Sequence, residues 1–322
     1  MFADQTNEFP ELDERFLRRL EALRLQLLRS ARHTSTRDFH GRRLSRHSGS
    51  SLEFSEYLAY SPGDDFRHVD WSVYARLGRL YSKRFESEQE LHVHILIDVS
   101  RSMYWQPDPT DGISQKSTLA LRLAATLSYL VLHHLDRIHL YFFDDKIIRT
   151  HHSRQNRLAI PNAFRFLNAV NSRHLPPAHP ESCSKALHEF IRQNPHPGSL
   201  LIISDFFDPT FLLREKIQEI LQRCRVAKLD TTLLQTLHID ELAPPARSFP
   251  PGEILLNDFE TDGQIHTFTT RNLSTKYRKK ICAYNEQLSA VAHANGFGYA
   301  QINTAQNFEK DTFPLLRESQ LI

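Results

Sequence analysis

The chain has few cysteines and no long apolar run. Its 322 residues include three cysteines, Cys183, Cys224 and Cys282, which are scattered and form no CxxC pair. This spacing excludes a disulfide framework and a zinc ribbon, so we expect the three to be small buried side chains. No apolar stretch approaches the roughly 20 residues that a membrane helix needs. The N-terminus has neither the basic region nor the apolar region of a signal peptide. We therefore expect a cytoplasmic protein with no membrane insertion.

The charge pattern and the absence of a phosphate-binding motif limit the functional classes. A formal net charge of +2 excludes a strongly acidic tail. No GxxxxGK[ST] sequence occurs, so the chain carries no P-loop ATPase site. Adjacent pairs such as His133-His134 do not face each other on a helix and predict no metal site. Arginines make the first 50 residues locally basic. Without interleaved aromatic residues, they favour a solvated helix face over a nucleic-acid-binding surface.

Apolar runs alternate with helical patterns along most of the chain, and 40% hydrophobic residues suffice for a sizeable core. This alternation predicts an α/β fold with a doubly wound, mostly parallel, Rossmann-like sheet, an N-terminal helix and a small β-rich segment. We expect strands at 93–97, 137–144, 200–204, 231–237 and 298–302. We expect helices at 11–32, 117–135, 156–170, 185–193, 211–224, 278–294 and 307–316. Pro161 should interrupt the third helix and Pro314 should break the last.

Turn signals and changes of pattern suggest where the chain divides. Alternating residues on both sides of the 261–263 turn predict an inserted hairpin at about 253–268. A second hairpin is expected where 146–150 pairs with the preceding strand across the Asp144-Asp145 turn. We expect an N-terminal helix, a β-rich segment and an α/β domain, at residues 1–34, 35–90 and 91–322.

Two predicted strands end at carboxylates. One apolar run ends at Asp98, with Ser100 and Ser102 following at alternate positions, and a second is followed by Asp205. Ligands of open α/β sheets bind beyond the carboxyl ends of the strands. Asp and Ser supply hard oxygen ligands that suit Mg²⁺ or Mn²⁺. If the two strands are neighbours, Asp98 and Asp205 face one cation. The alternative is that Asp98 and the two serines only cap the following segment, with no metal bound.

The segment from Leu52 to Glu88 combines a tight turn at Pro62-Gly63 with charged residues in aromatic surroundings. We favour a structural network of Asp and Arg side chains that holds this segment in place, because buried charges must be paired. The alternative is a partner-binding surface, since Arg, Trp and Tyr anchor protein interfaces. The residues in question are Asp64, Asp65, Arg67, Asp70, Trp71 and Arg76.

With both stretches in view, the chain resembles domain-of-unknown-function family 58, whose members join a PGDD-type segment to a von Willebrand factor A-like domain. The likeness rests on PGDD at 62–65, Arg67, Asp70-Trp71 and the DVSRSM sequence at 98–103. In such domains DxSxS forms a metal-ion-dependent adhesion site, which holds Mg²⁺ while a partner's carboxylate fills the open position. The resemblance implies that Ser100 and Ser102 bind the ion directly, and that Asp98 and Asp205 act partly through water.

The chain departs from that pattern at one ligand. Adhesion sites of this kind normally take a threonine from a second loop, and residues 179–187, HPESCSKAL, contain none. The position falls on Glu181 or Ser182, and the alternatives stay open. Ser182 would substitute as a hydroxyl ligand, whereas Glu181 would fill the site with its own carboxylate. Because the threonine is missing, the alternative that this site binds no Mg²⁺ also stays open.

The resemblance implies a non-enzymatic, metal-dependent protein-binding adaptor. It would work with a MoxR-type AAA ATPase in assembling or activating client complexes, and the client would donate an acidic side chain. One alternative is a Mg²⁺-dependent phosphotransferase or phosphatase with Asp98 as nucleophile. That chemistry wants an acid two residues later, where Ser100 is a poor proton donor. The other alternative is nucleic-acid binding through the basic N-terminus, which would weaken with salt.

Overall fold

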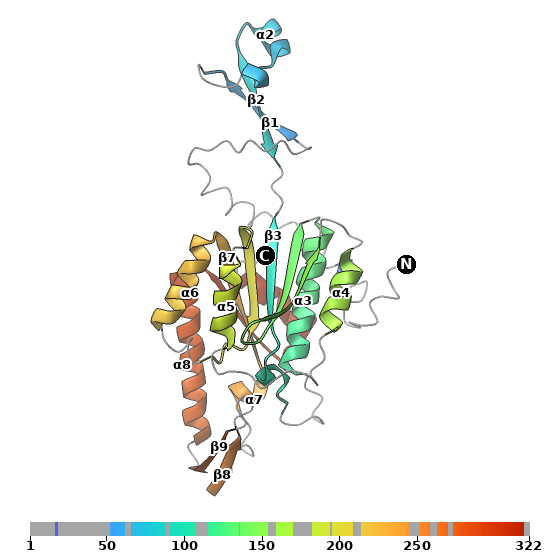
Figure 1. Ribbon diagram of the computed structural model, residues 1–322. Helices are drawn as coiled ribbons and strands as arrows, with labels where there is room; N and C mark the ends of the chain where they lie inside the picture. The colour runs from blue at the N-terminus through green and yellow to red at the C-terminus, as the bar shows by residue number, and fades with distance from the viewer. Residues whose placement is uncertain are drawn as a thin grey trace. The chain divides into compact units, whose positions relative to one another are not determined.

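A computed structural model describes most of the chain (Figure 1). By its internal contacts the chain divides into two compact units, one of Met1–Asp38 with Leu91–Ile322 and one of Phe39–Glu90. The residues described are 17–18, 52–61, 66–87, 91–106, 115–134, 136–153, 159–169, 182–193, 195–208, 214–244, 252–257, 263–269 and 273–318.

The large unit is built on a six-stranded sheet with the order β10-β7-β6-β3-β4-β5. Neighbouring strands are parallel except for β4 and β5, which form an antiparallel hairpin. The strands are β3 (His92–Asp98), β4 (Arg137–Phe143), β5 (Ile147–Ser153), β6 (Gly198–Ser204), β7 (Leu229–Leu237) and β10 (Gly298–Asn303). The predicted α/β fold with a mostly parallel sheet is thus confirmed, and so is the pairing across the Asp144-Asp145 turn.

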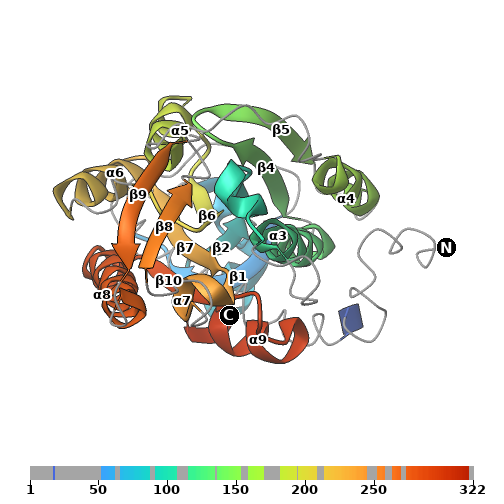
Figure 2. The same ribbon diagram turned by 90° about the horizontal axis from the view of Figure 1, so that it is seen from below.

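Helices cover both faces of this sheet (Figure 2). Helices α3 and α4 pack on one face, and α5, α6 and α8 pack on the other. The helices of this unit are α3 (Lys116–His133), α4 (Ile160–Asn168), α5 (Ser182–Arg192), α6 (Arg214–Val226), α7 (Ile239–Leu242), α8 (Leu273–Ala294) and α9 (Phe308–Glu318). A further hairpin, β8 (Gly252–Asn257) with β9 (Gln264–Thr269), stands between α7 and α8 in the chain.

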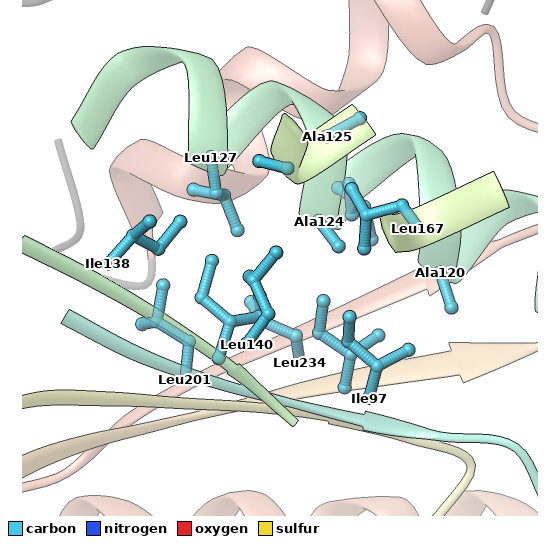
Figure 3. Packing of buried hydrophobic residues seen from close by; sticks show 14 of the residues in the cluster. Ile97, Ala120, Ala124, Ala125, Leu127, Ile138, Leu140, Leu167, Leu201 and Leu234 are labelled. Carbon is cyan, nitrogen blue, oxygen red and sulfur yellow. The ribbon is translucent and has the colours of Figure 1, made fainter. Parts of the chain in front are cut away.

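Alternation along β3 explains the two-sided core. Val93, Ile95 and Ile97 point to the face under α3 and α4, while Leu96 points to the face under α5. Figure 3 shows side chains from four neighbouring strands, Ile97, Leu140, Leu201 and Leu234 among them, meeting α3 and α4. Each fully buried Leu or Ile contributes about 1.5–3 kcal/mol relative to exposure to water. This packing fixes the strands whose ends build the site described below.

Two predictions about proline are wrong. Pro161 does not interrupt its helix but lies in the first turn of α4, where its missing N–H has no intrahelical partner to lose. Pro314 does not break the last helix, because α9 continues through it to Glu318. Pro314 is exposed, whereas Leu316, two residues later in α9, is buried in the core under α3. The free energy gained by burying Leu316 outweighs the backbone hydrogen bond that proline cannot donate.

The small unit, Phe39–Glu90, contains an antiparallel pair, β1 (Leu52–Ala59) with β2 (Tyr81–Ser87). Between these strands lie the 3-10 turn Phe66–His68 and α2 (Trp71–Leu77). Asp70 caps α2 by accepting hydrogen bonds from the backbone of Ser72 (2.9 Å) and Val73 (3.3 Å). Gly78 ends the helix in the left-handed conformation, φ 63°, which glycine adopts without strain.

The predicted N-terminal helix, residues 11–32, falls almost wholly outside the described residues. Leu17 and Arg18 are described and are helical. Leu17 packs against the core under α3 and α4. In the described part of the chain, no helix is both long enough and apolar enough to cross a membrane.

Candidate functional site

The site lies at the point of the sheet where the order of the strands reverses. The chain runs from β3 to β4 on one side and later returns to β6 on the other side of β3. In such sheets the crevice at this switch point, beyond the carboxyl ends of the strands, is where ligands bind. Asp98 is the last residue of β3, and Asp205 follows the last residue of β6. The two predicted carboxylates therefore meet at one edge, from strands that are hydrogen-bonded neighbours.

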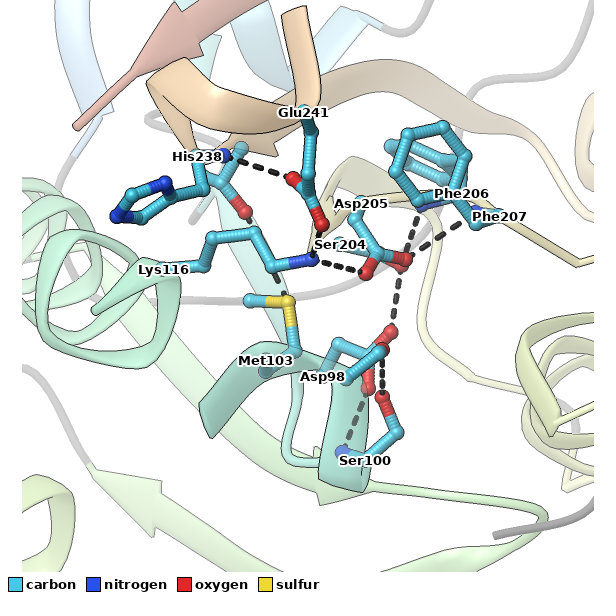
Figure 4. Close-up of polar contacts among 12 residues, drawn as sticks. Asp98, Ser100, Met103, Lys116, Ser204, Asp205, Phe206, Phe207, His238 and Glu241 are labelled. Carbon is cyan, nitrogen blue, oxygen red and sulfur yellow. Dashed lines mark hydrogen bonds and ion pairs between the residues drawn. The ribbon is translucent and has the colours of Figure 1, made fainter. Parts of the chain in front are cut away.

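Asp98 is 3% exposed and is held by neutral donors. Its Oδ1 accepts from the backbone N–H of Ser100 at 2.8 Å, and its Oδ2 accepts from the hydroxyl of Ser204 at 2.5 Å. The hydroxyls of Ser100 and Ser102 lie 3.1 Å apart. Figure 4 shows Asp98 and Ser100 close together where β3 ends. Asp98, Ser100 and Ser102 thus form one compact group of oxygen atoms.

Among the described residues, the hydrogen-bond partners of the buried Asp98 include no cation. Burial raises the pKa of this carboxyl above its ordinary range, and the nearby charge of Asp205 raises it further. The hydrogen bonds from Ser204 and Ser100 oppose this rise in pKa only partly. A cation placed against Asp98 would remove the penalty on its charged form.

Asp205 has a different environment. Its Oδ2 lies 2.8 Å from the ammonium of Lys116, and its Oδ1 accepts from the backbone N–H of Phe207 at 3.1 Å. The turn that presents Asp205 is strained, because Phe206 has φ 56°, a value that bulky residues rarely adopt. Complete burial of the Phe206 ring, and an N–H that donates to the Ser204 hydroxyl at 3.0 Å, hold this conformation in place.

Lys116 and Glu241 complete the group and were not predicted from the sequence. The Lys116 ammonium lies 2.6 Å from Oε1 of Glu241, and the other oxygen of Glu241 accepts from the backbone N–H of His238 at 2.8 Å. One signal for Lys116 was available. A lysine in the first turn of a helix opposes the helix dipole, so it indicates a carboxylate partner. Glu241 gave no comparable signal, because its role depends on where α7 lies after β7.

The predicted threonine substitute stays undecided. Glu181 lies outside the described residues. Ser182 begins α5, but its side chain is not among those described. Close to this helix start, the buried carboxylate of Asp208 accepts from the backbone N–H of Ser184 at 2.9 Å. Asp208 therefore tethers the start of α5 to the segment that follows β6.

The predicted partner-binding residues separate into two groups. Asp70 is 7% exposed and has a structural role, since its Oδ2 accepts from the ammonium of Lys83 (2.9 Å) and the hydroxyl of Tyr57 (2.9 Å). These bonds hold the pKa of Asp70 well below its ordinary value. Trp71, by contrast, is 63% exposed. Arg67 and Arg76 are also exposed, while Asp64 and Asp65 lie outside the described residues. Besides the backbone N–H groups of α2, the described partners of Asp70 are Lys83 and Tyr57, neither of them among the arginines of the predicted network.

The site fits a hard divalent cation by its chemistry. Asp98, Ser100 and Ser102 offer carboxylate and hydroxyl oxygens, the ligands that Mg²⁺ prefers. Across the described ranges, no three His, Cys, Asp or Glu side chains are arranged to hold a metal. The group at Asp98 differs from such clusters, because two of its three side chains are serines. A metal here would therefore depend on hydroxyls, on water and on an outside ligand.

The fold and this edge define the class: a Rossmann-like α/β protein with a polar group at its switch point. The chain belongs to the family described as "Protein of unknown function DUF58", which matches residues 56–287.

Among its relatives are uncharacterised proteins of two mycobacteria, Rv1480 of Mycobacterium tuberculosis and Mb1516 of Mycobacterium bovis. Each is 25% identical over 231 residues, which are 71% of this chain and 67% of the relative. A solved structure, the conserved hypothetical protein BatB from Bacteroides thetaiotaomicron, aligns with a TM-score of 0.37 and 12% identity. It covers 71% of this chain and 98% of its own.

Proposed function

We propose that this protein is a non-enzymatic adaptor that captures a partner protein through a divalent cation held at the carboxyl edge of its sheet. The observation that carries the proposal is the buried Asp98 carboxylate beside the Ser100 and Ser102 hydroxyls, with neutral donors as its hydrogen-bond partners. A von Willebrand factor A-like domain with an adhesion site would have this group at this edge.

In this proposal Ser100 and Ser102 hold Mg²⁺ or Mn²⁺ directly, and Asp98 and Asp205 act at least partly through water. When bound, the cation supplies a positive Lewis-acid position that an acidic side chain of the client can fill. Asp205 suits a role through water, because Lys116 and the Phe207 N–H already engage its two oxygens. Ser182 or Glu181 would complete the set of ligands.

Neither alternative function gains support from the described residues. A phosphotransferase or phosphatase needs a proton donor near the nucleophile, and Ser100 donates its backbone N–H to Asp98 while its hydroxyl lies against Ser102. Nucleic-acid binding would rest on N-terminal arginines, of which Arg18 alone is described. Both alternatives stay predictions that the tests below can revive.

The energy for any assembly reaction must come from a partner, because no P-loop sequence occurs in the chain. We propose a MoxR-type AAA ATPase for this role, and such a partner requires a cytoplasmic setting where ATP is present. The exposed aromatic residues of the small unit, Phe66 and Trp71, offer a second surface for protein contact.

The proposal is tested by capture experiments with and without the cation. The tagged chain is mixed with a purified MoxR-type ATPase and with lysate of the source cells, in Mg²⁺ or in EDTA. We expect a client to be retained only in Mg²⁺ by the wild type, and not by Asp98→Ala. Asp230→Asn, which removes a carboxylate near the start of β7 at the opposite edge, is the matched control and should behave as wild type. Equal retention in Mg²⁺ and EDTA by all three proteins would remove the idea.

A further inference from the structure

Lys116 is a lysine with no exposed surface. It is the first residue of α3, and its side chain is completely buried beside the carboxyl edge of the sheet. Burying an ammonium is unfavourable unless it is paired, and a positive charge at a helix N-terminus opposes the helix dipole. Strong partners must therefore hold this side chain in its charged form.

Those partners come from two other elements. The ammonium lies 2.8 Å from Asp205 after β6 and 2.6 Å from Glu241 in α7, and the Phe207 ring lies below it at 5.6 Å. Two carboxylates within hydrogen-bonding distance stabilise Lys116 in its charged form.

The charges of this group do not cancel. When all the groups are ionised, the carboxylates of Asp98, Asp205 and Glu241 outnumber the single ammonium of Lys116, which leaves two negative charges in a buried region. The ammonium is shared by Asp205 and Glu241, whereas Asp98 accepts from neutral donors. A divalent cation at Asp98 would balance the remaining charge.

We propose that Lys116 is an internal cation that competes with the divalent ion for Asp205 and so sets how tightly the site holds it. The inference rests on the proposed function for the ion itself. By holding Oδ2 of Asp205, the ammonium keeps that oxygen from direct ligation, and its charge repels a metal ion nearby. Glu241 acts in the opposite direction, because its carboxylate offsets part of the Lys116 charge. Both are positioning residues that act through Asp205.

The opposite signs of these effects separate this role from a structural one. Mg²⁺ affinity is measured by calorimetry on the full chain for wild type, Lys116→Met and Glu241→Gln. We expect Lys116→Met to bind Mg²⁺ about tenfold more tightly, and Glu241→Gln to bind it about threefold more weakly, through the lost Coulomb interactions. Lys279→Met, which removes an exposed ammonium on α8, should leave the affinity unchanged.

A purely structural ion pair would lower the melting temperature of both variants and leave their Mg²⁺ affinities within twofold of wild type. That result overturns the inference and leaves the proposed function intact. Binding by Lys116→Met but not by wild type supports the internal cation, and it contradicts metal-dependent capture by the wild-type chain. Binding by neither protein overturns both ideas. If Lys116→Met does not fold, unchanged affinity in Glu241→Gln overturns the inference, and weaker binding supports it.

Discussion

The two ends of β3 bury polar side chains with opposite chemistry. At the carboxyl end, Asp98 is a buried acid whose hydrogen-bond donors, among the residues that the structure describes, are neutral. At the amino end, His94 is 1% exposed, and its Nε2 lies 2.9 Å from the carbonyl oxygen of His196. A carbonyl only accepts, so the Nε2 of His94 carries the proton, and its Nδ1 can accept from the Tyr141 hydroxyl at 3.4 Å.

Other histidines extend this amino-end group across the strands. The ring of His139 pairs with His92 at 3.0 Å through one nitrogen and with His152 at 2.8 Å through the other. Burial lowers the pKa of His94 to about 4 and that of His139 to about 3, so these rings are neutral near neutral pH. His94 and His139 are thus neutral rings held by hydrogen bonds, whereas the carboxyl end is left with charge to balance.

This contrast teaches which end is structural. Neutral groups with mutual hydrogen bonds stabilise a fold without a ligand. A buried carboxylate without a paired positive charge is unfavourable in a fold, and carboxyl groups with raised pKa values are frequent at functional sites. The predictions below test the contrast from either end.

Removing the internal cation should have the largest effect. Lys116→Met leaves Asp205 and Glu241 as uncompensated buried charges, so metal-free protein should lose about 3–5 kcal/mol of unfolding free energy. Urea denaturation in EDTA measures this loss, and added Mg²⁺ should recover part of it. A loss below about 1 kcal/mol would contradict the charged network.

Acid should destabilise the amino end. The pKa of His94 is about 4 in the folded chain and about 6.5 when unfolded. Between these values the unfolded chain binds more protons, so stability falls as the pH drops from about 6.5 to 4, by about 3 kcal/mol from this residue. The half-buried His139 acts in the same direction, but solvent screening reduces its share.

Denaturation curves across this pH range measure the slope. His94→Phe, which keeps an aromatic ring beside Phe190 and Tyr141, should make the slope of stability against pH shallower. The contribution of Asp98 depends on pH in the opposite direction. Its raised pKa favours protonation in the folded state, so its contribution to the stability of the metal-free protein is lost as the pH rises. An unchanged slope in His94→Phe would show that other groups carry the acid sensitivity.

A side chain at Gly198 should also destabilise the fold, by less than the changes above. A Cβ at this first residue of β6 would lie 2.0 Å from the carbonyl oxygen of His92, so the two strands would have to shift. Gly198→Ala should lose about 1–3 kcal/mol in urea denaturation, the usual range for overpacking. The control is Ser199→Ala, at the next residue of β6, which is partly exposed. This change adds no atom to the strand, so its effect should stay within about 0.5 kcal/mol. Equal stability of the two variants would refute the close approach.

The sequence predicted the carboxyl end better than the amino end, for a physical reason. Asp98 and Asp205 each follow an apolar run, and parallel strands bring such residues to one edge whatever the details of packing. The histidine group depends on register, because His94 pairs with His139 and His139 with His152 only in the final alignment of β3, β4 and β5.

The identity of the two partners of Lys116 could not be predicted, for a related reason. The ion pairs join residues 89 and 125 positions apart, through a turn and a short helix whose placement follows from tertiary packing. The continuation of α9 through Pro314 has the same origin, since burial of Leu316 outweighs the local preference of proline. Local sequence patterns predict the helices and strands, whereas contacts between distant residues determine which charged side chains pair.

The most direct test of the central claim compares melting temperatures of wild type and Asp98→Asn in EDTA and in Mg²⁺. We predict that Asp98→Asn melts at or above the wild-type temperature in EDTA, because it removes a buried charge that lies near Asp205. In Mg²⁺ the wild type should gain several degrees through binding to the folded state alone, and the variant should gain none. If Mg²⁺ raises both melting temperatures equally, or raises neither, Asp98 does not hold a divalent cation.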